Sequence, residues 1–323
     1  MQNLKSMMTN KLLNKCLYIA AVNFFLLACS SGAENGVDDE PTPPQPERPT
    51  GRIPIDISAS ITRVTETEFE EGDAVGLYVV NRNDNGLQNN IKTSGNHVDN
   101  MRYTYSGNKW TPDEMVYWKD DRTFADFYLY YPYDYLYPYR EHPVFSVRQD
   151  QSNINSYKQS DFIIGSALNV APSKNAVPIA TRHVMSRVEI VLKPGEGLTD
   201  EALAASDVKV EVNVPIKSAE IDFMDGNVVP VENSDNDTRY NIRTYKDGNV
   251  YHAFVVPQYV PQSNLITVIV DGRYFFLSKA FNFESGKSYM FTVTLGKAIS
   301  GLNVTITAWD YDGVDYGGTA IEE

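Results

Sequence analysis

Hydrophobic and polar residues alternate along much of the chain, and this period of two predicts strands with one buried face. The first such segment, residues 53–61, places five apolar side chains on one side: Ile53, Ile55, Ile57, Ala59 and Ile61. The same alternation recurs later, in residues 208–214, 289–295 and 302–308. Helical periodicity is scarce, and only residues 199–205 predict a short helix, with Thr199 as its cap.

Turn signals separate these segments at short intervals. Asp271-Gly272 stands between two apolar runs and predicts a hairpin, because both residues tolerate the positive φ angles of a tight turn. Residues 225–227 and 246–249 predict further turns. Many short strands with frequent turns are typical of β-sandwiches. About 270 residues follow residue 51, a length that favours two sandwiches over one.

A polar, proline-bearing stretch, residues 171–178, suggests where two such units join. We therefore predict an N-terminal β-sandwich domain over residues 52–176 and a C-terminal β-sandwich domain over residues 177–323. The segments before residue 52 have a different composition and are expected to lie outside both domains.

The N-terminus has the pattern of an export signal. Three lysines precede the apolar run of residues 16–28, which has the length of a signal-peptide core and is too short to span a bilayer. The run ends in Leu26-Leu27-Ala28-Cys29, which resembles a bacterial lipobox. We predict a lipoprotein signal peptide over residues 1–28 and lipid attachment at Cys29. An ordinary secretory signal with an incidental cysteine is the alternative.

The next segment, residues 29–51, reads as a disordered tether. It is rich in proline and acidic residues and contains Val37 as its one large apolar residue, so it cannot form a core. The only other cysteine, Cys16, lies within the signal core and would be removed with it. The mature chain then has no thiol left for a disulfide or a thiolate metal site.

Composition excludes some functions and nominates no catalytic group. The net charge of −14 and the lack of a basic stripe argue against nucleic-acid binding. The four histidines are not paired at metal-ligand spacing, and residues 285–288 contain GKS without the first glycine of a phosphate loop. Acidic turns at residues 233–237 and 310–315 lack the remaining ligands of a calcium loop. We expect no cofactor, no metal and no enzymatic activity.

Residues 127–139 hold seven tyrosines. We interpret residues 127–132 as an aromatic core strand and the rest as a proline-bent loop. Tyrosine buries its ring while presenting a hydroxyl, which suits contacts with proteins or carbohydrates. The candidate residues for contact with a host or glycan ligand are Tyr133, Tyr135, Tyr137 and Tyr139.

Several short motifs together resemble the fimbrillin family, the two-domain lipoprotein subunits of type V pili. In chain order they are Phe69-Glu70-Glu71-Gly72-Asp73-Ala74-Val75-Gly76-Leu77-Tyr78, the Tyr130-Tyr131-Pro132 strand end, Ser160-Asp161-Phe162 with Arg182-His183-Val184-Met185-Ser186-Arg187-Val188, Val256-Pro257-Gln258, Gly286-Lys287-Ser288-Tyr289 and Ile306 to Trp309. Independently of the family, Pro257 would end a strand, and His183 reads as a packed or capping residue. The resemblance implies an all-β fold of two tandem β-sandwiches, transthyretin-like and Greek-key in type.

The resemblance also implies a mechanism of assembly. An arginine-specific protease cuts after the first strand, and a strand from the next pilus subunit fills the groove that is left. In this sequence Arg63 follows the alternating strand of residues 53–61 and is the expected cleavage site. Arg52 and Arg48 are alternatives. Cleavage at Arg52 would leave the strand attached, and Pro49 follows Arg48.

The C-terminal segment, residues 310–323, departs from what a repeating stalk subunit needs. It offers few apolar residues for donation: Val314, Ala320 and Ile321. We therefore expect a tip or accessory subunit acting in adhesion at the outer membrane or fimbrium. Alternatives are a pilus anchor that keeps Cys29, a surface glycan-binding lipoprotein, and an exported hydrolase whose site goes unrecognised.

Overall fold

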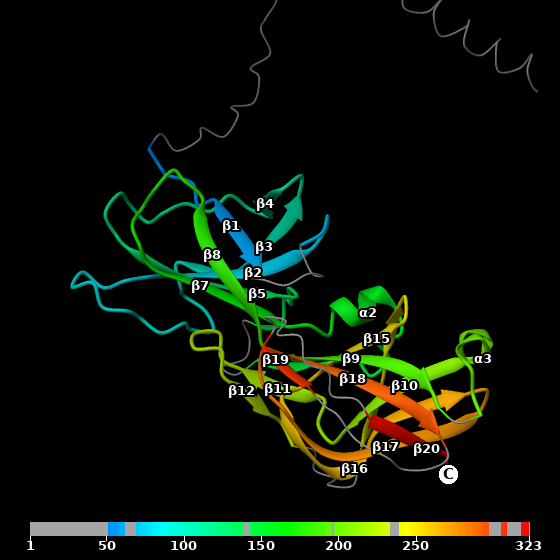
Figure 1. Ribbon diagram of the computed structural model, residues 1–323. Coiled ribbons are helices and arrows are strands. Elements are labelled where there is room, and N and C mark those ends of the chain that lie inside the picture. The colour runs from blue at the N-terminus through cyan, green and yellow to red at the C-terminus, as the bar shows by residue number, and fades with distance from the viewer. Residues whose placement is uncertain are drawn as a thin grey trace, which may run out of the picture. The chain divides into compact units, whose positions relative to one another are not determined.

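The folded chain begins with a seven-stranded sheet, shown in the computed structural model of Figure 1. The structure describes residues 51–61, 69–137, 143–195, 197–232, 239–296, 305–308 and 318–322. The strand order in this sheet is β1-β8-β7-β5-β2-β3-β4. The bounds are β1 Ile57–Ile61, β2 Ala74–Asn81, β3 Val98–Ser106, β4 Lys109–Pro112, β5 Ala125–Tyr131, β7 Ile163–Val170 and β8 Val177–His183.

The second half of the chain forms a ten-stranded sheet and shares a small three-stranded sheet with β6. The large sheet runs β13-β10-β16-β17-β20-β18-β9-β15-β14, and β19 pairs with β18. Its strands are β9 Ser186–Pro194, β10 Val208–Val214, β13 Tyr240–Arg243, β14 Tyr245–Asp247, β15 Val250–Val255, β16 Gln258–Val270, β17 Arg273–Phe283, β18 Lys287–Gly296, β19 Thr305–Ala308 and β20 Gly318–Glu322. The small sheet joins β12 Val228–Pro230, β11 Ser218–Ile221 and β6 Val144–Ser146.

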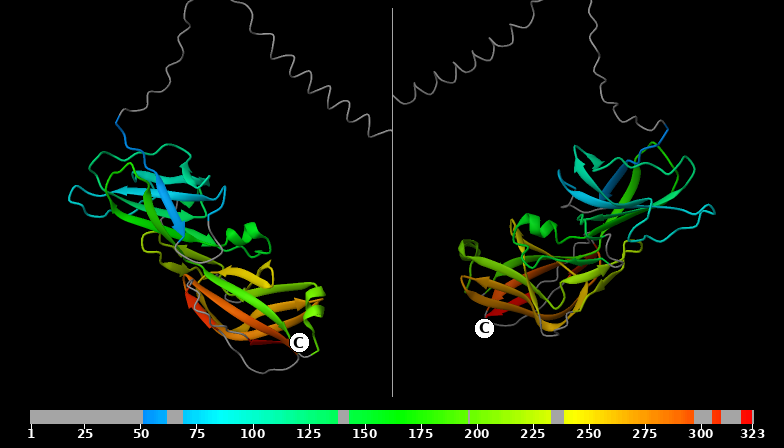
Figure 2. Two further views of the ribbon diagram at one scale, coloured as in Figure 1. Left: turned by 45° about the horizontal axis from the view of Figure 1, so that its top comes forward. Right: turned by 180° about the vertical axis from the view of Figure 1, so that it is seen from behind.

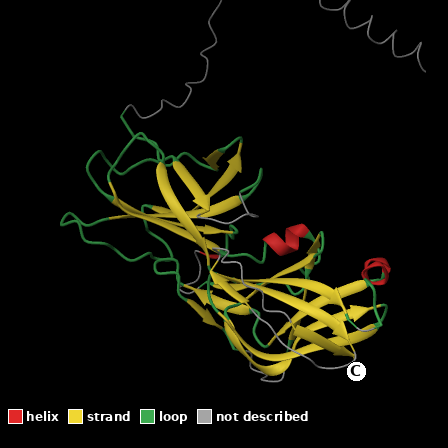
Figure 3. Ribbon diagram, viewed as in Figure 1, coloured by secondary structure: helices red, strands yellow, loops and turns green. Residues whose placement is uncertain are grey.

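Strands dominate the described residues, and the helices are two short ones, α2 Ile154–Lys158 and α3 Asp200–Ala205 (Figure 3). The predicted all-β class is confirmed. No described helix has the length and apolar character needed to cross a bilayer. The signal peptide, Cys29 and the tether up to residue 50 lie outside the described residues, as do the acidic turns at residues 233–237 and 310–315.

The central strands of the first sheet are buried on both faces. All seven residues of β5 are buried, and so are the six inner residues of β2. One face of β2, with Leu77, packs into a core cluster with Ile55 and Phe127. The other face, with Tyr78, belongs to a second cluster that extends through the strands of the ten-stranded sheet. This double burial explains why these two strands read as near-continuous apolar runs rather than alternating ones.

Local signals in the sequence located several elements correctly. Asp271 and Gly272 have φ angles of 49° and 81° and join β16 to β17, as predicted for a tight hairpin. The side chain of Thr199 accepts a hydrogen bond from the backbone of Ala202 and caps α3. Pro257 lies between the end of β15 and the start of β16. Gly286, in the GKS segment, forms the turn between β17 and β18 with a φ of 66°.

The change from one large sheet to the other does not coincide with the predicted boundary at residues 176 and 177. Strand β8, which begins at Val177, pairs with β7 and β1 in the first sheet. The proline-bearing stretch before it is the loop of the β7–β8 hairpin, so its composition marks a turn and not a linker. The switch falls at Val184 and Met185, between β8 and β9.

Candidate functional site

The first strand completes the seven-stranded sheet by pairing in parallel with β8, along which it lies in Figure 2. The register runs from Ile57 opposite Val177 to Ile61 opposite Thr181. Two hydrogen bonds extend this pairing at its ends. The backbone N–H of Val177 donates to the carbonyl of Asp56 at 2.8 Å, and the Thr181 hydroxyl donates to the carbonyl of Ser60 at 3.1 Å.

Just before β1, the chain pairs with a different partner. The N–H of Ile55 donates to the carbonyl of Val116 at 3.0 Å, and the N–H of Trp118 donates to the carbonyl of Ile53 at 2.9 Å. These bonds flank an antiparallel bridge between Pro54 and Tyr117. Residues 53–61 therefore connect the β8 edge of the sheet with the segment that follows β4, and so close the sheet around its core.

The side chains of this segment alternate as predicted. Ile55 and Ile57 are 2% and 5% exposed, while the intervening Asp56 points to solvent. Ile53 and Ala59 are partly buried against the same cluster. The backbone of Ile61 takes part in the strand, and its side chain is outside the described residues. These residues present an apolar row on the core side of the segment.

The segment that would carry the cut, residues 62–68 with Arg63, lies outside the described residues, as does Arg48. Arg52 is exposed just ahead of the first strand. The ring of Phe69 packs edge-on against Trp110, with 4.8 Å between ring centroids. Tyr131 and Tyr105 complete the aromatic surroundings of Phe69 at 5.9 and 6.4 Å.

The turn after Phe69 is fixed by polar contacts. Glu70 forms an ion pair with Lys158 of α2. The carboxylate of Glu71 accepts hydrogen bonds from the Ser106 hydroxyl and from the Gly107 N–H, which together lower its pKa. Asp73 accepts from the Glu70 N–H at 2.8 Å, and burial raises the pKa of Asp73. The chain is thus anchored to the first sheet from Phe69 onward.

The four candidate tyrosines have different environments. Tyr135 is 67% exposed, and Tyr133 is partly buried with the Arg102 guanidinium 5.7 Å from its ring centroid. Tyr137 cannot present its ring on the surface, because it is 6% exposed and packs 5.0 Å from Tyr130. Tyr139 lies outside the described residues. A shared tyrosine surface is therefore not formed by the described members of this set.

In two of the motifs, a polar side chain pairs with a partner that the sequence did not predict. In the VPQ segment, the Gln258 side chain accepts from the N–H of Ile216 at 2.9 Å and donates to its carbonyl at 2.6 Å. The side-chain amide of Gln258 therefore pairs with Ile216 in the way that the backbone of a neighbouring strand would. In the other motif, Asp161 and His183 face each other with Nδ1 and Oδ2 2.7 Å apart. The predicted packed role of His183 is confirmed by its burial.

No group of acidic, histidine or cysteine side chains that could hold a metal ion occurs among the residues described. The geometry around β1 is one of strand pairing and apolar packing. Fold and site together define an all-β protein with sandwich domains, whose first strand closes the sheet that follows it.

A family model described as Fimbrillin-like matches residues 62–309, more than half of the chain. The chain therefore belongs to the fimbrillin-like family, and the resemblance inferred from the motifs is confirmed. Its family is one of fimbrial and adhesion structural proteins rather than of enzymes. Fimbrial subunits generally assemble with other pilus subunits, and membership of this family implies a location at the cell surface or fimbrium.

Known proteins share part of the sequence or the fold of this chain. The chain is 26% identical to a Bacteroides uniformis protein that carries the name fimbrium subunit Fim1C, over 94% of this chain and 96% of that one. A solved structure of a Bacteroides ovatus protein, described as a cell adhesion protein, has a TM-score of 0.61 at 18% identity and covers 80% of this chain and 96% of that one. A Bacteroides uniformis protein, also described as a cell adhesion protein, has a TM-score of 0.56 at 18% identity, with coverages of 81% and 100%.

Proposed function

We propose that this chain is a tip or accessory fimbrial subunit that mediates cell adhesion and assembles by exchange of its first strand. It is exported as a lipoprotein through Cys29, reaches the outer membrane, and is cut after Arg63 by an arginine-specific protease. A strand from the neighbouring subunit then takes the place of residues 53–61. The observation that carries the proposal is that this segment closes the first sheet and precedes Arg63 in the chain.

The energetics of the first strand support exchange rather than simple loss. Burial of Ile55 and Ile57 stabilises the sheet by about 1.5–3 kcal/mol each. Removal of the strand would also leave the edge of β8 and the backbone groups of Val116 and Trp118 without partners. A donated strand with apolar residues at alternate positions restores both the burial and the hydrogen bonds by β-augmentation.

The anchoring of the chain from Phe69 onward also supports the proposal. A cut after Arg63 would leave a new N-terminus at Val64, five residues before Phe69. The aromatic surroundings of Phe69 and the ion pair of Glu70 with Lys158 would hold the start of β2 in place. Only the position of β1 beside β8 would become vacant, and the remaining sheet could receive another strand there.

The tip or accessory role is supported by the C-terminal strand. In this chain β20 pairs in parallel with β18 and antiparallel with β17, within its own ten-stranded sheet. Its sequence, Gly318 to Glu322, contains two apolar residues other than glycine, Ala320 and Ile321. A subunit of this kind is better suited to accepting a strand than to donating one.

Mass spectrometry of the N-terminus, applied to cell-surface protein and to isolated fibres, tests the proposal. We expect the fibre form to begin at Val64 and the precursor to carry lipid on Cys29. The variant Arg63→Lys should block processing by an arginine-specific protease, and Arg52→Lys serves as the matched control. Fibres in which Thr62-Arg63 is uncut and Cys29 is still attached would contradict strand exchange and favour an anchor subunit.

A further inference from the structure

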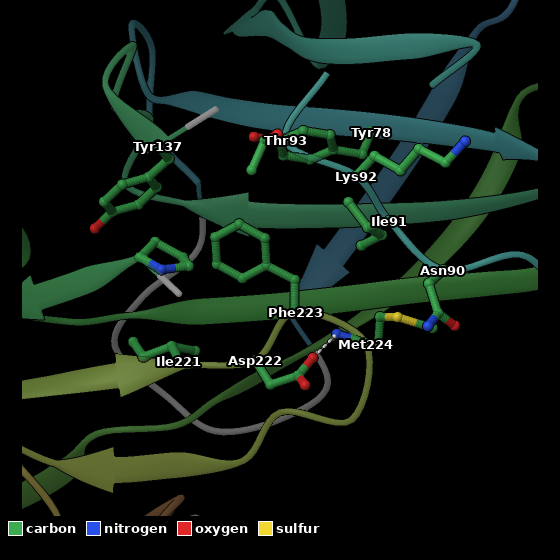
Figure 4. A pocket seen from close by; sticks show the side chains of 11 residues that line it. Tyr78, Asn90, Ile91, Lys92, Thr93, Tyr137, Ile221, Asp222, Phe223 and Met224 are labelled. Atoms are coloured by element: carbon green, nitrogen blue, oxygen red, sulfur yellow. Dashed lines mark hydrogen bonds between the residues drawn. The ribbon is translucent and has the colours of Figure 1, made fainter. Parts of the chain in front are cut away.

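A cavity of about 560 Å³ lies beside the second face of the first sheet. Its walls come from parts of the chain that are distant in sequence (Figure 4). They are β2, the connection between β2 and β3, Tyr137 after β5, Pro143 before β6, and the end of β11 with the turn that follows it. This volume falls within the range of 300–1,000 Å³ that is usual for small-molecule sites. The cavity contains no residue of β1. A ligand bound there would therefore add to the function proposed above.

The floor of the cavity is aromatic. In Figure 4 the ring of Phe223 projects into the space between Tyr137 and Tyr78. Phe223 is partly exposed, and it stacks on Tyr130 with 4.7 Å between ring centroids and an interplanar angle of 8°. Burial raises the pKa of the Tyr78 phenol, which therefore stays protonated and able to donate a hydrogen bond. Such a floor suits a ligand with an apolar face and polar edges.

The rim of the cavity is polar and carries no net charge. It contains Asn90, Lys92, Thr93 and Asp222. Asp222 accepts a hydrogen bond from the Met224 N–H with one carboxylate oxygen. Within the part of the chain that the structure describes, the side chains of the other three make no hydrogen bond. One ammonium and one carboxylate cancel, so the rim offers donors and acceptors without selecting a charged ligand.

The connection that supplies this rim is unusually long and is held in place at its start. It spans residues 82–97 and contains no helix or strand. The Arg82 guanidinium forms an ion pair at 2.9 Å with Asp126, which is fully buried. Long connections without secondary structure are uncommon in compact domains and are usually functional.

Two further hydrogen bonds fix the middle of the connection just ahead of the rim. Gln88 donates a hydrogen bond at 2.7 Å to the hydroxyl of Tyr128 on β5. Asn89 donates at 2.7 Å to the carbonyl of Asn81 at the end of β2. These contacts hold residues 90–93 over the aromatic floor, and pre-organisation of this kind lowers the entropic cost of binding.

We propose that this cavity binds a short neutral saccharide. The C–H face of a sugar ring matches the partly exposed ring of Phe223. Its hydroxyl groups match the amide, hydroxyl and ammonium groups of the rim and the second carboxylate oxygen of Asp222. An anionic ligand is disfavoured because Asp222 faces the same space as Lys92. A purely apolar ligand is disfavoured because it would remove these polar groups from water without replacing their hydrogen bonds.

A glycan array of neutral, sialylated and sulfated oligosaccharides, probed with the purified full chain, tests this proposal. We expect binding to neutral glycans, to be quantified by ligand-observed NMR with the best of them. The variant Asn90→Trp places a large side chain in the rim and should weaken binding at least about tenfold, equivalent to 1.4 kcal/mol. Ser94→Ala changes an exposed residue of the same connection that does not line the cavity, and should bind like wild type.

Three results would overturn the proposal. The first is a folded chain that binds no neutral glycan on the array. The second is binding that Asn90→Trp leaves unchanged, which would place the sugar elsewhere. The third is binding restricted to sialylated or sulfated glycans, which would show that Lys92 alone determines the ligand. Near-ultraviolet circular dichroism of each variant establishes that the fold is retained.

Discussion

The imidazole Nδ1 of His183 lies 2.7 Å from the carboxylate Oδ2 of Asp161, and both side chains are 2% exposed. Asp161 precedes β7 and His183 ends β8, so the pair ties together the two ends of one hairpin. The Val184 N–H adds a backbone hydrogen bond at 2.9 Å to the carbonyl of Phe162. The pair lies where the chain leaves the first large sheet for the second.

This buried pair predicts a large loss of stability in His183→Ala. The substitution leaves the Asp161 carboxylate buried without its imidazole partner, which should cost about 3 kcal/mol or more in the free energy of unfolding. Urea denaturation followed by tryptophan fluorescence measures the change, since Trp110 and Trp118 belong to the core of the first sheet. The control is His97→Ala, whose imidazole is only partly buried and bonds to a backbone carbonyl. A cost below 1 kcal/mol for His183→Ala would contradict a structural role for the pair.

Strand exchange predicts that Ile57 matters only before processing. Ile57→Ala should lower the free energy of unfolding of the uncut chain by about 2–5 kcal/mol, because its side chain is 5% exposed in the core. The same substitution should have no effect on fibres or on protein cut after Arg63. Ser58→Ala, on the exposed face of the same strand, should change the unfolding free energy by less than about 0.5 kcal/mol. Equal effects of Ile57→Ala before and after processing would show that the strand is retained.

The amide of Gln258 predicts a second stability effect. Gln258→Leu keeps the size of the side chain and leaves the N–H and the carbonyl of Ile216 without their partner, at about 1–3 kcal/mol for each part-buried group. Thermal unfolding of the purified chain measures the loss. Gln262→Leu is the matched control, since Gln262 is exposed and bonds to the Ala280 N–H. Similar melting temperatures for the two variants would refute a special role for Gln258.

Asp73 predicts a dependence of stability on pH. Burial raises the pKa of Asp73 in the folded chain, so the folded state binds this proton more tightly than the unfolded state. The contribution of Asp73 to stability therefore falls as the pH rises from the unfolded value of about 3.9 through the raised folded value, and stays constant above it. The variant Asp73→Asn should lose this slope in urea titrations between pH 4 and 7.

The neighbouring Glu71 offers a control of opposite sign. Hydrogen bonds from Ser106 and Gly107 lower its pKa, so its contribution to stability is present above the unfolded value and is lost as the pH falls through the lowered folded value. Glu71→Gln should therefore change the slope in the direction opposite to Asp73→Asn. Changes of the same sign in both variants would contradict the burial effect at Asp73.

Local chemistry in the sequence was sufficient for several elements. Asp271-Gly272 located a hairpin because few other residues adopt positive φ at two successive positions. Thr199 located a helix because its hydroxyl satisfies a free backbone N–H. The alternation of residues 53–59 predicted which side chains of the first strand are buried. Each of these signals depends on neighbours within a few residues.

Contacts between residues that are far apart in the sequence could not be predicted from such local signals. The loop of residues 171–176 has the composition of a linker between domains. It nevertheless joins two strands of one sheet, because β8 pairs with both β7 and β1. Tyr137 lies in a segment whose composition predicts an exposed aromatic loop. It is buried because Tyr130 and Phe162 pack against it. The roles of Gln258 and Asp161 also depend on partners distant in sequence.

The sequence by itself determined the strand-rich class, the turns and the buried face of the first strand, because these follow from periodicity and local backbone preference. It indicated the family through the resemblance of several short motifs taken in chain order. Only the tertiary structure decided that this segment pairs with β8 on one side and with residues 116–118 on the other. It also decided that residues 90–93 lie over an aromatic floor. The reason is physical: alternation fixes which face of a strand is buried, whereas the partner of its edge depends on the geometry of the whole sheet.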